Sequence, residues 1–125
     1  MNRRELQLLA RERLRDSRVL LSNGRHVGAY YLAGYAVECA ITACIAKQTR
    51  RFDFPDKTVV ANSHTHDLTK LIVIAGLKQE FAASALTEQA FDINWLVVKD
   101  WMVEDRYNQS ISPTDAKDLY RAISS

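Results

Sequence analysis

The hydrophobic positions of this chain recur at helical spacing in several stretches, and the longest stretch is apolar on almost every side. Between Val27 and Ala46 the clearly polar residues are Glu38 and Thr42. A run of this length favours a helix, because buried strands are usually about 4–8 residues long. A helix that is apolar nearly all round lies at the centre of a bundle. The pattern therefore predicts a central helix at residues 27–46.

Wound at about 3.6 residues per turn, the central helix carries three different stripes. One is apolar, one contains only alanine, and the third has an oxygen atom on every side chain. The apolar stripe is Tyr30, Gly34, Val37, Ile41 and Ile45, the alanine stripe is Ala29, Ala33, Ala36, Ala40 and Ala43, and the third is Tyr31, Tyr35, Glu38 and Thr42. We expect another helix to lie close on the alanines. We expect the third stripe to form a polar seam in the core or at its edge.

Amphipathic patterns predict further helices on both sides of the central one. Residues 3–22 place Leu6, Ala10, Leu14, Ser17 and Leu21 on one face. This helix ends at Asn23-Gly24, where glycine suits the left-handed position after a helix. The short turn that follows predicts an antiparallel pair with the central helix. The central helix is expected to fray in residues 47–51, and Pro55 predicts a loop over residues 52–65.

The second half of the chain predicts shorter helices. A third helix begins near His66, with Thr65 or Ser63 as its cap and Asp67 in its first turn, and Gly76 ends it. A short helical piece follows at residues 78–86. A fourth helix runs from its cap Thr87 to about Tyr107, with Phe91, Trp95, Val98 and Met102 on one face. Ser112 and Pro113 start the last helix, which carries Ala116, Leu119, Tyr120 and Ile123.

These elements predict an all-α fold, an up-and-down bundle of four or five helices in a single domain over residues 1–125. The chain of 125 residues is long enough to bury a core, and 47% hydrophobic and 26% charged residues are typical of a soluble protein. Cys39 and Cys44 point to different sides of the central helix, which indicates buried thiols in a reducing compartment. Glu38 and three tyrosines argue against a membrane role for that helix. Met1-Asn-Arg-Arg is followed by a charged helix rather than by the apolar segment of a signal peptide, so we expect a cytoplasmic protein.

The net charge of +2 conceals an asymmetry along the chain. Residues 1–25 contain seven arginines and three acidic residues, a net charge of +4, so the remainder carries −2. A basic first helix could face phosphate groups. The alternative is a solvated outer face, because acidic and basic residues alternate along this helix as they do on surface helices.

The segment Ala29-Tyr-Tyr-Leu-Ala-Gly-Tyr-Ala-Val-Glu-Cys-Ala40 resembles the second-helix signature of HEPN domains, which are small helical bundles. His66-Asp67-Leu68 and Trp101 followed by Arg106-Tyr107 fit the same pattern in the same order. The resemblance covers roughly residues 5–122. It implies a HEPN-like helical domain that self-associates as a homodimer. Such domains often act with a minimal nucleotidyltransferase partner in toxin–antitoxin or defence systems.

The resemblance also implies a test for ribonuclease activity. Many HEPN domains are metal-independent ribonucleases whose signature places an arginine five to seven residues before a histidine. No arginine stands at that distance before His26, His64 or His66, and no histidine follows Arg106. Histidine is the side chain whose ordinary pKa suits proton transfer in both directions near neutral pH. The sequence therefore favours a noncatalytic domain.

The candidate ligand-binding residues come from three parts of the predicted bundle. They are Arg106 and Tyr107 near the end of the fourth helix, His66 and Asp67 at the start of the third, and Tyr31, Tyr35 and Glu38 on the central helix. The arginine could hold a phosphate, the helix start could add its dipole, and a tyrosine could stack on a base. The alternative is a structural network in which Glu38 pairs with Arg106 and His66 caps its helix.

Three functions remain open at this point. The first is a binding module for a nucleotide or RNA, without a catalytic residue or cofactor. The second is a ribonuclease toxin with a rearranged site, in which Arg106 and His66 are the catalytic candidates. The third is a purely structural interaction protein. No metal site is predicted, because His64 and His66 have no cysteine or third histidine nearby.

Overall fold

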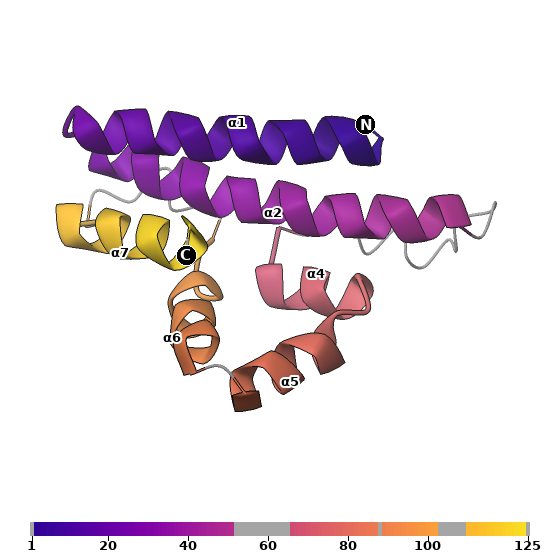
Figure 1. Ribbon diagram of the computed structural model, residues 1–125. Helices are drawn as coiled ribbons and strands as arrows, with labels where there is room; N and C mark the ends of the chain where they lie inside the picture. Colours follow the sequence, from indigo (N-terminus) through magenta and orange to yellow (C-terminus); the bar gives the residue numbers. More distant parts are fainter. Residues whose placement is uncertain (1, 52–65, 88, 103–109, 125) are drawn as a thin grey trace.

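The computed structural model describes residues 2–51, 66–87, 89–102 and 110–124, and this part of the chain is an all-α bundle without strands. The predicted fold class is confirmed. Six helices are present in the described part: α1 (Arg3–Ser22), α2 (His26–Arg51), α4 (Leu68–Ile74), α5 (Lys78–Thr87), α6 (Gln89–Val98) and α7 (Pro113–Ser124). Figure 1 shows α1, α2 and α7 lying roughly along one direction, whereas α6 crosses them.

The pair of α1 and α2 forms the frame of the bundle, and the two helices run antiparallel as predicted (Figure 1). Asn2 caps α1, and its Oδ1 accepts a hydrogen bond of 2.8 Å from the backbone N–H of Glu5. Gly24 adopts a left-handed φ of 73° directly after the helix, and the backbone N–H of Arg25 donates to the Leu20 carbonyl at 2.8 Å. These bonds are those of a glycine-terminated helix end. The prediction for Gly24 is confirmed.

The close packing of α1 on α2 depends on small residues. Ala29 and Ala33 are completely buried, and the Ser17 hydroxyl donates a buried hydrogen bond of 2.7 Å to the carbonyl of Ala29. Ala36 and Ala43 are buried as well, but Ala40 is exposed. The alanine stripe is therefore covered except at Ala40.

The expected fraying of residues 47–51 is wrong, since α2 continues as a helix to Arg51. Within α2, the segment His26–Ala46 is long and apolar enough to cross a membrane by length and composition alone. Half of its most apolar window is buried inside the bundle.

The helix predicted to start near His66 begins later, at Leu68, and Asp67 is its cap rather than a first-turn residue. The Asp67 carboxylate accepts a hydrogen bond of 3.1 Å from the backbone N–H of Lys70. The two proposed caps, Ser63 and Thr65, lie outside the described residues. The expected stop at Gly76 is confirmed, because this glycine has a φ of 73° and ends α4.

The predicted fourth helix is wrong at both ends. Thr87 is the last residue of α5 rather than a cap, and α6 ends at Val98 instead of near Tyr107. After Val98 the chain turns and carries Trp101 into the core, where its side chain is 1% exposed. The indole ring lies against Gly34 of α2, at the place where a Cβ atom would sit. A continuous helix would not deliver Trp101 to this contact. Met102, expected on the apolar face, is exposed.

The last helix, α7, begins as predicted at Pro113. The Ser112 hydroxyl accepts a hydrogen bond from the backbone N–H of Asp115, and the Asp115 carboxylate accepts one from the backbone N–H of Ser112, both at 3.0 Å. These reciprocal bonds satisfy two backbone donors that the helix start would otherwise leave unpaired. They also lower the pKa of Asp115. Ala116 and Leu119 are buried, as expected.

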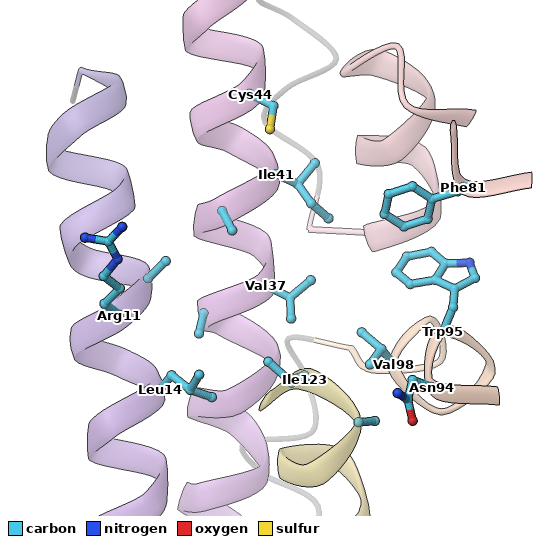
Figure 2. A pocket seen from close by; sticks show the side chains of 14 residues that line it. Arg11, Leu14, Val37, Ile41, Cys44, Phe81, Asn94, Trp95, Val98 and Ile123 are labelled. Carbon is cyan, nitrogen blue, oxygen red and sulfur yellow. The ribbon is translucent and has the colours of Figure 1, made fainter. Parts of the chain in front are cut away.

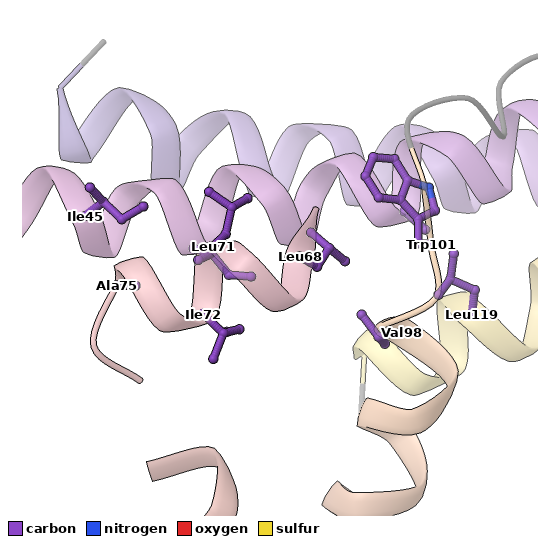
Figure 3. Packing of buried hydrophobic residues seen from close by; sticks show 10 residues of the cluster. Ile45, Leu68, Leu71, Ile72, Ala75, Val98, Trp101 and Leu119 are labelled. Atoms are coloured by element: carbon purple, nitrogen blue, oxygen red, sulfur yellow. The ribbon is translucent and has the colours of Figure 1, made fainter. Parts of the chain in front are cut away.

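One hydrophobic core joins these helices, and Figure 3 shows its side chains between α2, α4 and α7. Its buried members are Ala33, Ile41, Ile45, Leu68, Leu71, Ile72, Ala75, Val98, Trp101 and Leu119. Of the other helices in the described part, α1, α4 and α7 pack directly on α2, whereas α6 packs on α7 and α5 on α6.

Candidate functional site

Tyr31, Tyr35 and Glu38 lie on one edge of α2, and His66 reaches the same edge from the start of α4. We call these four residues the polar edge. Three of them share a face because they are spaced four and three residues apart on a helix. His66 arrives there because the apolar side of α4 packs onto α2 and its cap, Asp67, fixes where the helix begins.

The closest polar contact of this edge joins His66 to Glu38. Nδ1 of His66 lies in hydrogen-bond contact with Oε1 of Glu38. The Glu38 side chain is 9% exposed and the His66 side chain is 55% exposed. The pair therefore connects a buried carboxylate to an imidazole that solvent reaches. On the next turn of α2, the Thr42 hydroxyl donates to the backbone carbonyl of Glu38 at 2.8 Å.

Burial controls the electrostatics of Glu38. Loss of contact with water raises the pKa of its carboxyl group, and the contact with His66 lowers it by a smaller amount. The second carboxylate oxygen, Oε2, is buried and has no hydrogen-bond partner among the described residues. A buried acceptor left in this state costs free energy.

The tyrosines form an aromatic layer beside the pair. The rings of Tyr31 and Tyr35 are stacked, with centroids 6.1 Å apart and planes 19° apart. Tyr31 also meets the buried Trp101, at a centroid distance of 6.0 Å. Burial, followed by the neighbouring Cys39, raises the pKa of Tyr35. Its hydroxyl is thus held in the neutral form, in which it both donates and accepts hydrogen bonds.

Five of the seven candidate residues lie in the described part of the structure. Tyr31, Tyr35, Glu38 and His66 come together, and Asp67 stands beside them as the cap of α4. The two remaining candidates, Arg106 and Tyr107, lie outside the described residues. The suggested role of His66 as a helix cap is wrong, because Asp67 has that role. No group of three or more histidine, cysteine, aspartate or glutamate side chains that could hold a metal is found in the described residues.

A second feature escaped the sequence analysis. A pocket of about 550 Å³ opens along another side of α2, between α1 on one side and α5, α6 and α7 on the other (Figure 2). We call it the apolar groove. Its lining is Ala10, Arg11, Leu14, Ala36, Val37, Ala40, Ile41, Cys44, Phe81, Asn94, Trp95, Val98, Ala122 and Ile123. The apolar character of α2 on nearly all sides suggested full coverage, whereas this side is only partly covered.

The chain matches no protein-family model, no curated protein and no solved structure at a significant level.

Proposed function

We propose that this protein is a noncatalytic HEPN-like module that binds a nucleotide or RNA at the polar edge and acts with a partner nucleotidyltransferase in a toxin–antitoxin or defence system. The observation that carries the proposal is the contact between the exposed His66 and the buried Glu38, beside two stacked tyrosines. The all-α bundle and the resemblance of residues 29–40 to the HEPN signature support it. The same resemblance supports a cytoplasmic homodimer.

The polar edge offers the groups that recognise an unpaired base. Proteins that read single-stranded RNA stack bases on aromatic rings and bond their polar edges with side chains. Tyr31 and Tyr35 supply rings that are partly exposed, and Glu38 holds the His66 ring in place beside them. His66 supplies a solvent-facing ring nitrogen, because Nδ1 is occupied by Glu38 and leaves Nε2 on the other side of the ring.

The test is binding of ATP and of a short single-stranded RNA to the purified chain. His66→Ala should weaken binding about tenfold, the effect of losing one hydrogen bond to a charged or strongly polar partner. His26→Ala is the matched control, because His26 begins α2 three turns before Glu38 and should bind as the parent does. RNA affinity should also fall as salt rises. If neither ligand binds, the proposal is wrong.

The same contact favours a second candidate function, a metal-independent ribonuclease. A carboxylate that holds one imidazole nitrogen orients the ring and increases its capacity to accept a proton at the other nitrogen. In this role His66 would be the general base and Arg106 would bind the phosphate. Incubation of RNA with a large excess of the protein and a chelator decides the question. Cleavage abolished by His66→Ala and by Arg106→Ala supports a ribonuclease, and intact RNA excludes it.

A further inference from the structure

The apolar groove has a continuous hydrophobic floor that remains open to solvent. The floor is one side of α2 and includes Val37, Ala40 and Ile41, and Ala40 is exposed. Phe81 and Trp95 make one wall, with their rings edge to face at a centroid distance of 4.9 Å and an angle of 87°. Figure 2 shows this pair across α2 from Arg11. Small residues in such a floor allow another chain to approach closely.

A row of positive charge runs along an exposed side of α1, and one of its residues lines the groove. Arg11 lines the groove, and Arg4 and Arg18 lie seven residues before and after it. Residues seven apart fall on nearly the same line of a helix, so the row extends over about 21 Å along α1. All three arginines are exposed. The acidic residues of α1, Glu5, Glu12 and Asp16, fall on the flank turned away from the groove.

The arginine row on α1 and the apolar floor on α2 together indicate which kind of molecule fits the groove. A small anionic molecule needs one cation, whereas three cations at heptad spacing match a partner with anions repeated over the same length. A nucleic acid carries such anions, but it would leave the apolar floor without apolar contacts. An amphipathic helix with an apolar stripe and a row of acidic residues satisfies both features at once.

We propose that the apolar groove binds an acidic amphipathic α-helix of another protein. The apolar stripe of that helix lies on Val37, Ala40 and Ile41 and against Trp95, and its acidic row faces the arginines of α1. The groove lies on a different side of α2 from the polar edge. The proposal therefore does not depend on nucleotide or RNA binding, and its test uses neither ligand.

The experiment uses two designed peptides of about 21 residues, three heptads, added to the full chain. Both have the same stripe of leucine and alanine, and they differ only in three heptad-spaced positions beside it, which are glutamate in one and lysine in the other. Binding is measured by fluorescence anisotropy of the labelled peptide. Coverage of the groove is measured by the rate of alkylation of Cys44, which lines the groove and is a free thiol. Buried Cys39 serves as the internal reference.

The glutamate peptide should bind at least about tenfold more tightly than the lysine peptide and should slow the alkylation of Cys44. Arg11→Glu should remove most of the preference between the two peptides. Lys117→Glu, the same charge change on an exposed position of α7, should leave the preference unchanged. Ala40→Trp, which fills the floor at an exposed position, should weaken both peptides. Circular dichroism confirms that each variant keeps its helices.

Three results would overturn the proposal. One is equal affinity of the two peptides, because the arginine row would then have no role in recognition. Another is binding without slower alkylation of Cys44, which would place the peptide elsewhere on the protein. The third is slower alkylation of Cys44 as the protein alone is concentrated, together with a dimer in sedimentation, since a second copy would then be the occupant.

Discussion

The polar edge and the apolar groove lie on different sides of the same helix, and they differ in how completely the bundle covers them. Beside the polar edge, Gly34 is closed over by Trp101, and Glu38 is 7% exposed. In the groove, Ala40 on the same helix is exposed. The residue types of α2 alone do not produce this difference. It arises because α4 and the turn after α6 cover one side, whereas α1 and α7 pack on α2 beside the groove and leave Ala40 uncovered.

The two regions also place their polar groups differently. The polar edge holds a carboxyl group inside the bundle, where burial raises its pKa and one oxygen lacks a partner in the described part of the chain. The groove keeps its charge at the rim, on Arg11, above an apolar floor. A buried polar group recognises a ligand through hydrogen bonds. An apolar floor with a charged rim recognises the surface of a partner through the apolar area that is buried and through charge. Substitutions on the two sides of α2 should therefore change the free energy of unfolding by different amounts.

The largest difference is expected between the two tryptophans. Trp101→Ala removes a side chain that is 1% exposed and should lower the free energy of unfolding by about 3–5 kcal/mol. Trp95→Ala removes a half-buried side chain from the wall of the groove and should cost less than half as much, about 1–2 kcal/mol. Urea denaturation followed by circular dichroism measures both. Equal losses would mean that the groove is as tightly packed as the core.

A pair of glycines on α2 gives the next largest contrast. Gly34→Ala places a methyl group within the Trp101 ring and should destabilise the protein by about 1–3 kcal/mol. Gly28→Ala meets only the end of the Leu20 side chain, at 3.4 Å, in the first turn of α2. It should stabilise the protein by up to about 1 kcal/mol, because alanine favours the helix. Thermal unfolding distinguishes the two, and a stabilising Gly34→Ala would contradict the contact with Trp101.

These contrasts also show which features the sequence could predict. The C-terminal end of α1 depends on Gly24, and the start of α7 depends on Ser112 and Asp115. These residues lie next to the helix ends in the sequence, so local sequence rules predict both ends. The end of α6 depends on a contact between Trp101 and Gly34, which are far apart in the sequence. Helical periodicity continues past Val98 and contains no sign of that contact. A local pattern therefore predicted a longer helix than the structure has.

The polar edge and the apolar groove also differ in how far the sequence predicts them. The sequence grouped Tyr31, Tyr35 and Glu38 correctly because one helix fixes their spacing. It named His66, on another helix, as a further candidate for the same site, and the contact with Glu38 is present in the structure. The groove depends on which sides of α2 the other helices leave uncovered. That information lies in the arrangement of five helices and in no single segment.

A smaller effect, with a defined dependence on pH, is expected from Glu38→Gln. Because burial raises the pKa of Glu38, the folded parent binds this proton more tightly than the unfolded chain does. The stability of the parent should therefore fall as pH rises from about 4.5, the ordinary value for glutamate, through the raised pKa. Glutamine does not titrate and removes this fall. At pH 8 the variant should be the more stable protein, by on the order of 1 kcal/mol.

Urea denaturation at several pH values between about pH 4 and pH 8 tests this prediction. Glu80→Gln is the matched control, because Glu80 is an exposed carboxylate on α5. Its variant should follow the pH dependence of the parent. A parent whose stability rises over the same range, relative to Glu38→Gln, would show that the pKa of Glu38 is lowered in the folded protein.

The smallest effect is expected at Ala40, and it is the most direct test of the difference between the two regions. Ala40→Leu adds a larger side chain at an exposed position in the groove and should change the free energy of unfolding by no more than about 0.5 kcal/mol. Ala33→Leu makes the same change at a position of α2 that is 0% exposed and should destabilise the protein by about 1–3 kcal/mol. Parallel urea denaturations compare them. Because both substitutions lower helix propensity only slightly and add the same atoms, a large loss at Ala40 would mean that the groove is closed in solution.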